Sequence, residues 1–347
     1  MFQTNDTHGQ QSFFDGREWL PDNLRQALDN SWADTFYREV FCQIPEELFA
    51  PLYSADAASR PNTPVNVLMG AEILKSGFGW SDLELIEHIR FDLQVRHALG
   101  LNDLRGEVFT VRTLYNFRRR VREYAAETGT NLYGQVFEHV TDEQLAELPV
   151  DTGWQRMDST QVLSNLANWS RLELLIAVVQ QVHAALPKEL QAKWKAEVAP
   201  YLEGRPRQVS YRLKSSETQT HLQRLGELLV AWETALTPAA PESEALALAQ
   251  RVLREQYEQT PEGLVLRAAQ EVSSASLQSP HDPDATYRVK NGKAYRGGYV
   301  VNASETAAPD NEVQLLIALE VAGNRVDDAD LLGENLSRAR GTSQLPS

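Results

Sequence analysis

The sequence predicts a mainly α-helical protein with an additional α/β part. Apolar residues recur at helical spacing between residues 64 and 124 and again between 172 and 256. Extended-looking runs occur near residues 154–162 and 286–321, and the second run is interrupted by Asn291-Gly292. This dipeptide is a strong hairpin signal, because both turn positions need a positive φ.

Length and composition are those of an ordinary folded protein. The 347 residues, 42% of them hydrophobic, suffice for two domains or for one domain with a large insertion. A single cysteine, Cys42, excludes an internal disulfide and fits a reducing compartment. The N-terminus lacks the features of a secretory signal, and the most apolar helix, 172–182, is too short to span a bilayer. We therefore expect a soluble, cytoplasmic protein without membrane partners.

The charge distribution is uneven along the chain. A formal net charge of -15 opposes binding to DNA phosphates as a whole. The segment from Arg105 to Arg122, however, contains six arginines and one acid, Glu107. A strongly basic segment thus lies within an acidic protein.

Two helices are predicted ahead of this basic segment. The first spans Pro64 to Ser76 and ends at Gly77 and Gly79. The second begins at a capping box formed by Ser81 and Glu84 and continues to about Leu99, with Gly100 as its stop.

A third helix, capped by Thr110, carries the arginines. Its apolar residues fall on one arc, and its arginines occupy the rest of the surface: Leu114, Phe117, Val121 and Tyr124 against Arg112, Arg118, Arg119, Arg120 and Arg122. Two interpretations remain open at this point. The arginine face either contacts DNA phosphates or is a solvated helix face next to acidic neighbours.

The middle of the chain is helix-like and without evident chemistry. His183 and His221 are isolated there and are typical of packing or surface residues. A Pro-Ala linker at residues 237–241 separates the last two helices. The predicted helices are Leu172–Leu186, Lys188–Leu202, Thr218–Leu236 and Glu242–Gln256.

Strands return after residue 285. A hairpin of Thr286–Lys290 and Lys293–Glu305 is predicted, with Arg288, Lys290, Lys293 and Arg296 around its tip. These cations either contact a DNA backbone or solubilise an exposed turn. Val313–Val321 reads as a strand buried on both faces, and Asp327 as the cap of a helix over Asp328–Ala339.

Two segments resemble a known family. Trp154-Gln155-Arg156-Met157-Asp158-Ser159-Thr160-Gln161-Val162 and, far downstream, residues 295–306 resemble the DDE transposases of bacterial insertion sequences. The resemblance implies an N-terminal helical domain with a helix-turn-helix-like element and an RNase H-like core. It also implies three acidic residues that hold two Mg²⁺ or Mn²⁺ ions, because phosphoryl transfer depends on positioning and charge neutralisation. Asp158 matches the first acid.

Domain boundaries follow from the resemblance. Residues 1–150 form the helical, DNA-binding domain, 151–163 the first core strand, 164–280 a helical insertion, and 281–347 the second and third strands and first helix of an incomplete core. The second aspartate and the glutamate of the family have no match here, and Glu305, Asp327 and Asp328 are poor substitutes. We therefore expect a C-terminally truncated core in which the Asp158 strand has an open edge and the C-terminal part of the chain is poorly stable.

Three functions are compatible with this reading. The chain is a transposase fragment, inactive alone and completed by a second polypeptide or a downstream reading frame; a non-catalytic regulator that binds element ends; or a decayed remnant. For the first two, the expected DNA contacts are Arg112, Arg118, Arg119, Arg122, Lys290 and Lys293, and self-association is a further possibility.

Overall fold

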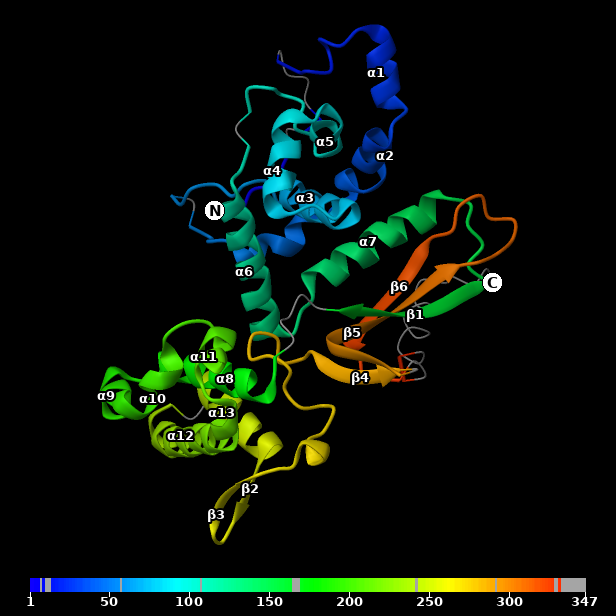
Figure 1. Ribbon diagram of the computed structural model, residues 1–347. Coiled ribbons are helices and arrows are strands. Elements are labelled where there is room, and N and C mark those ends of the chain that lie inside the picture. The colour runs from blue at the N-terminus through cyan, green and yellow to red at the C-terminus, as the bar shows by residue number, and fades with distance from the viewer. Residues whose placement is uncertain are drawn as a thin grey trace. The chain divides into compact units, whose positions relative to one another are not determined.

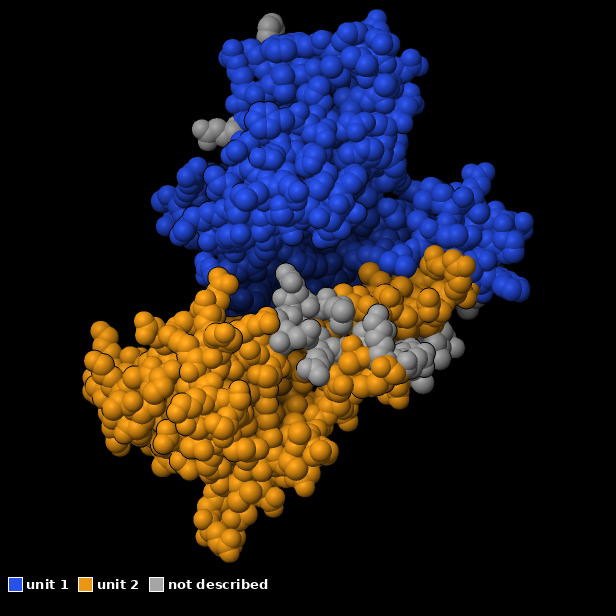
Figure 2. Space-filling model, in the orientation of Figure 1, with its two compact units in different colours: residues 1–154, 306–317 blue, residues 155–305, 318–347 orange. Residues whose placement is uncertain are grey.

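The computed structural model is mainly helical, with a small antiparallel sheet part (Figure 1). It divides into two compact units, coloured separately in Figure 2: unit 1 comprises residues 1–154 and 306–317, and unit 2 comprises residues 155–305 and 318–347. The structure describes residues 1–6, 8–9, 14–56, 58–106, 108–163, 169–240, 243–290, 292–327 and 330–331.

Unit 1 is built from helices. Leu68, Leu85 and Phe117, each 2% exposed or less, anchor a core shared by several of these helices. The elements are α1 Asp22–Asp29, α2 Trp32–Glu39, η1 Phe41–Gln43, η2 Glu46–Leu52, α3 Val65–Phe78, α4 Asp82–Phe91, α5 Leu93–Ala98, α6 Val111–Thr128 and α7 Leu132–Glu147.

The stop and start signals around α3 and α4 act as the sequence predicts. Gly79 ends α3 in the left-handed region at φ 71°. Ser81 and Glu84 form a capping box, with Glu84 N donating to Ser81 Oγ at 3.3 Å and Ser81 N donating to Glu84 Oε2 at 2.7 Å. The expectation of one helix up to Leu99 was wrong, because Asp92 is extended and its carboxylate accepts from Gln94 N at 2.9 Å to begin α5.

Unit 2 contains a helical segment with a hydrophobic core of its own. The core residues, among them Leu175, Tyr201 and Trp232, all lie between residues 172 and 277. The elements are α8 Arg171–Ala185, α9 Lys188–Lys193, α10 Lys195–Leu202, α11 Pro206–Arg212, η3 Ser215–Glu217, α12 Thr218–Ala239, α13 Glu244–Gln256, β2 Tyr257–Thr260, β3 Gly263–Leu266 and η4 Ala269–Glu271.

Several boundaries in this segment differ from the predictions. The helix expected over Lys188–Leu202 is interrupted at Trp194. The linker expected at residues 237–241 is also wrong in part, since α12 continues through Pro238. The helix tolerates this proline because it lies in the last turn, where few further helical hydrogen bonds depend on it. Helix α11 and the β2–β3 hairpin were not anticipated.

The remaining strands form one sheet, in which β5 is the central strand. The order is β1-β5-β4, and β6 also pairs with β5. The strands are β1 Gln155–Leu163, β4 Thr286–Lys290, β5 Lys293–Thr306 and β6 Leu316–Gly323. Antiparallel pairing of β4 with β5 and the φ of 75° at Gly292 confirm the predicted hairpin, although Asn291 lies outside the described residues.

Strand β6 is less buried than the sequence suggested. Only Ile317 and Ala318 are buried, whereas Val313, 46% exposed, and Val321, 58% exposed, face solvent. Most residues of β6 are at least partly exposed, so the expectation of a strand buried on both faces was wrong. Most of the helix expected over Asp328–Ala339 lies outside the described residues.

None of the helices in the described part of the chain combines the length and the apolarity that crossing a bilayer requires.

Candidate DNA-binding face and the Asp158 strand

Helix α6 separates an apolar side from a basic one. Leu114, Phe117 and Val121 are buried in the core of unit 1. Thr110 occupies the N-cap position without a side-chain capping bond, and Gly129 ends the helix at φ 73°. The amphipathic pattern therefore fixes which side of α6 faces outward.

Arg118 points to the interior side of this helix and is fully engaged by acids. Its Nε donates to Glu72 Oε1 on α3 at 2.7 Å, and its Nη2 donates to Asp82 Oδ1 on α4 at 2.7 Å. Two further bonds, at 3.1 and 3.0 Å, make both contacts bidentate. Lys75 Nζ lies 3.6 Å from Asp82 Oδ1. The guanidinium joins three helices and has little capacity left for a phosphate.

These contacts shift the acid–base equilibria of the group. Hydrogen bonds from Arg118 hold the pKa of Asp82 below its usual value of 3.8, although partial burial acts in the opposite direction. The pKa of Arg118 is raised in turn, chiefly by its hydrogen bond to Asp82. Arg118 is thus a permanent cation within the fold.

The outward side of α6 presents the other arginines. With residues about 100° apart, Arg112, Arg119 and Arg122 fall within an arc of about 80°, opposite Val121. All three are exposed. Arg119 forms a surface pair with Glu123 at 2.9 Å, four residues on, and such a pair is weak enough for a phosphate to replace it.

Arg120 lies at the edge of this face and is held by a ring. Its guanidinium carbon is 4.9 Å from the centroid of Tyr53. On α6, Arg118 is thus paired with acids and Arg120 contacts a ring. The three outward arginines form a surface that we call the α6 arginine face: Arg112, Arg119 and Arg122.

Asp158 lies on the exposed side of β1. Along this strand exposure alternates, so Arg156, Asp158 and Thr160 face outward while Met157 and Ser159 are half-buried. The carboxylate of Asp158 accepts a hydrogen bond from Ser159 N at 2.8 Å.

Side-chain contacts give the register of β1 against β5. Arg156 Nε donates to Glu305 Oε1 at 2.6 Å, and Asn302 Nδ2 donates to Ser159 Oγ at 2.8 Å. The numbers rise on one strand as they fall on the other, so the strands are antiparallel.

The acids near Asp158 do not make a metal site in the described part of the chain. Glu305, the nearest candidate by register, is already paired with Arg156. Among the described residues there is no group of three or more His, Cys, Asp or Glu side chains that could hold a metal ion. Two divalent ions need several shared carboxylates, so Asp158 with its described neighbours does not fit them.

The basic hairpin tip is only partly described. The side chains of Lys290 and Lys293 lie outside the described residues. Arg288 is used internally, since its Nη1 donates to Asn324 O and to Val326 O, both at 3.1 Å, and its Nη2 lies 3.2 Å from Asp327 Oδ1.

Comparison with known proteins adds one finding to this geometry. Residues 25–120 match the family model described as Transposase domain (DUF772). The match supports a transposase family. The matched segment runs from within α1 into α6, so it includes Arg112, Arg118 and Arg119, whereas Asp158 and the sheet lie outside it. Neither curated proteins nor solved structures gave a match.

Sequence reasoning found the basic helix but not its internal partners. Glu72 and Asp82 lie 46 and 36 residues from Arg118 in sequence. A signal was nevertheless present, because Arg118 is the arginine nearest in angle to the buried side of α6, where a charge needs a partner. Helical spacing thus places Arg118 closer to the buried side than Arg112, Arg119 and Arg122, although it does not name its partners.

Proposed function

We propose that this chain is a DNA transposase polypeptide that binds duplex DNA through the α6 arginine face. The observation that carries the proposal is the position of this face on the helix with which the matched transposase domain ends. The ends of an insertion sequence are the proposed target. Helices α4, α5 and α6, with contacts of α4 to both others, supply the helix-turn-helix-like element.

Electrostatics supports this assignment despite the net charge of -15. In the transposase domain, Glu72 and Asp82 are turned toward Arg118 and away from the outward face. Phosphates need cations that are accessible and weakly paired, and Arg112, Arg119 and Arg122 meet this condition. The acidic remainder of the chain opposes non-specific binding, so affinity depends on this local face.

Catalysis at Asp158 is the second part of the proposal. Strand β5 pairs with both β1 and β6, which agrees with the first three strands of an RNase H-like core, with Asp158 on the first. The Mg²⁺ or Mn²⁺ ions of such a site require further carboxylates, either from residues outside the described part or from a complementing polypeptide or second copy. Metal-dependent cleavage and strand transfer are therefore assigned to the assembled enzyme.

A non-catalytic role is the alternative that one observation favours. The described residues bring no group of three metal-binding side chains together, whereas the α6 arginine face lies wholly within the described part of the chain. A nicking assay with Mn²⁺ on supercoiled DNA separates the two roles. Nicking by the isolated chain that is lost in Asp158→Asn would favour catalysis over regulation.

The binding proposal is tested with a labelled duplex by fluorescence anisotropy. Replacing Arg112, Arg119 and Arg122 by alanine is expected to weaken binding at least tenfold at low salt. A matched control removes the same three charges from exposed, unmatched positions of unit 2, with Lys188, Lys195 and Arg207 changed to alanine. Equal losses of duplex affinity in both triple variants would contradict the proposal, because affinity would then depend on net charge alone.

A further inference from the structure

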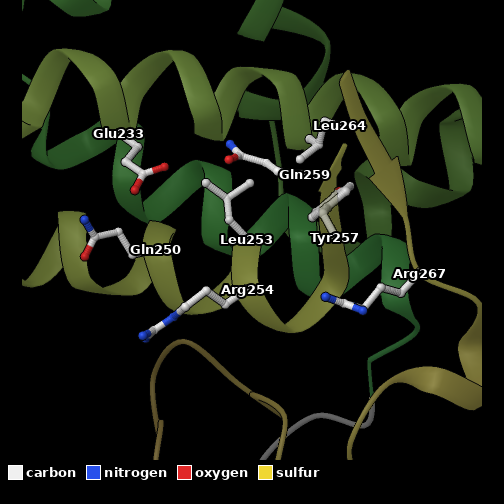
Figure 3. A pocket seen from close by; sticks show the side chains of 8 residues that line it. All are labelled: Glu233, Gln250, Leu253, Arg254, Tyr257, Gln259, Leu264 and Arg267. Carbon is white, nitrogen blue, oxygen red and sulfur yellow. The ribbon is translucent and has the colours of Figure 1, made fainter. Parts of the chain in front are cut away.

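Unit 2 contains a pocket that the transposase assignment does not use. It has a volume of about 500 Å³ and lies among α12, α13 and the β2–β3 hairpin (Figure 3). Leu253, Tyr257 and Leu264 form its apolar floor, and polar side chains surround them. A pocket of this size, with an apolar lining and a few polar groups, is typical of small-ligand sites.

The floor is held rigidly. Tyr257 donates from its hydroxyl to Leu222 O at 2.6 Å, and its ring fills the space beside Gly226, where a Cβ would approach within 2.6 Å. Gln223 Nε2 donates to Leu264 O at 2.8 Å and ties the hairpin to α12. The pocket is therefore preformed by contacts within the fold.

Arg171 ties the end of α13 to the segment that follows β3. Its Nη1 donates to Arg267 O at 2.7 Å, and its Nη2 donates to Gln256 O at 2.8 Å. Its third bond, from Nε to Gln256 Oε1, is also 2.8 Å. These partly buried contacts fix the backbone from which the Arg267 side chain projects.

The rim differs from the floor, because most of its polar side chains make no hydrogen bond or ion pair among the described residues. Among the described residues, Glu233, Gln250, Arg254 and Gln259 have no hydrogen-bond or ion-pair partner for their side chains. Arg267 has only a long contact of 3.8 Å to Glu258. Figure 3 shows these groups arranged around Leu253 and Tyr257, with both arginines on the α13 side.

We propose that this pocket binds a nucleotide unit. Arg254 and Arg267 each place a guanidinium group on the rim, and either one can pair with a phosphate. The apolar floor suits the face of a base, and carboxamides such as those of Gln250 and Gln259 match a base edge, because each both donates and accepts. Glu233 accepts from an exocyclic amine.

Two sources offer this chemistry: a free nucleoside monophosphate, and an unpaired nucleotide of a DNA single strand. The second source rests on the proposed function, since it makes the pocket part of the DNA path. The pocket itself is independent of the α6 arginine face, which belongs to the other unit.

The test uses the full chain with three probes: a labelled single-stranded oligonucleotide, a labelled duplex and free dAMP as competitor. Changing Arg254 and Arg267 together to alanine is expected to weaken single-strand binding at least tenfold and to leave duplex binding within twofold. Lys195 and Arg207, exposed positions outside the pocket, are changed together to alanine as the control for the two lost charges. The rim substitutions touch no core residue, so folding is preserved.

Every outcome is decisive. Displacement of the strand by dAMP, or dAMP binding that the double variant loses, identifies the free nucleotide as a ligand. A strand that dAMP does not displace, but that the variant fails to bind, identifies the strand. The pocket proposal is contradicted if the wild-type chain binds neither the single strand nor dAMP. It is also contradicted if the double variant binds the single strand and dAMP within twofold of wild type. Loss of duplex binding alone would instead refute the proposed function.

Discussion

Helix α6 and strand β1 both carry charged residues that the sequence marks as functional, but the structure treats them differently. On α6, Arg118 is paired with acids of α3 and α4, whereas the α6 arginine face is exposed. On β1 the Asp158 carboxylate is exposed and bonds only the next backbone amide in the described part. A run of cations on a defined helix yields a surface, whereas a single carboxylate needs partners before it becomes a site.

The largest expected effect separates inward from outward arginines on α6. Arg118→Ala leaves Glu72 and Asp82 without their partner in a partly buried place, so we expect a loss of about 2 kcal/mol in the free energy of unfolding. Arg119→Ala removes only a surface pair worth about 0.3–0.5 kcal/mol. Urea unfolding, with hydrogen exchange of the α6 amides as a local readout, compares the two. Similar losses of unfolding free energy in the two variants would contradict the distinction between inward and outward arginines.

A pH titration sharpens the same distinction. Because the pKa of folded Asp82 lies below 3.8, its stabilisation is complete above that pH and is lost as pH falls through the folded value. The stability difference between wild type and Arg118→Ala should therefore narrow below pH 3.8, by a fraction of the full effect. Unfolding midpoints measured from neutral to acidic pH check this. A constant difference would show that Asp82 is not the linked group.

The smallest effect is expected on β1. Asp158→Asn should change stability by less than about 0.5 kcal/mol, since the side chain is exposed and lacks a charged partner among the described residues. If a complementing polypeptide supplies the remaining carboxylates, Mn²⁺ should not raise the thermal midpoint of the isolated chain. A Mn²⁺-dependent increase that Asp158→Asn abolishes would show that further acids complete the site within this chain.

The sequence was most informative where one local rule decides the structure. Ser81 and Glu84 marked the start of α4, and Asn291-Gly292 marked the β4–β5 hairpin, because capping and turn geometry depend on neighbours in sequence. The break at Asp92 was missed, since a continuous apolar pattern hides a change of direction. The low burial of β6 depends on what covers the two faces of the sheet, and spacing carries no such information.

The candidate sites were less predictable for the same reason. The outward positions of Arg112, Arg119 and Arg122 follow from helical spacing, but the Glu72 and Asp82 partners of Arg118 come from other helices. The rim of the unit 2 pocket joins α12, α13 and a hairpin that the sequence did not reveal.

The salt dependence of duplex binding tests the central claim most directly. Each phosphate contact contributes a slope of about -0.9 to a plot of log affinity against log salt concentration. Changing Arg112, Arg119 and Arg122 to alanine should therefore reduce the magnitude of the slope by about 2 to 3, while Arg118→Lys should leave it unchanged. An unchanged slope in the triple variant would contradict the assignment of the α6 arginine face to DNA.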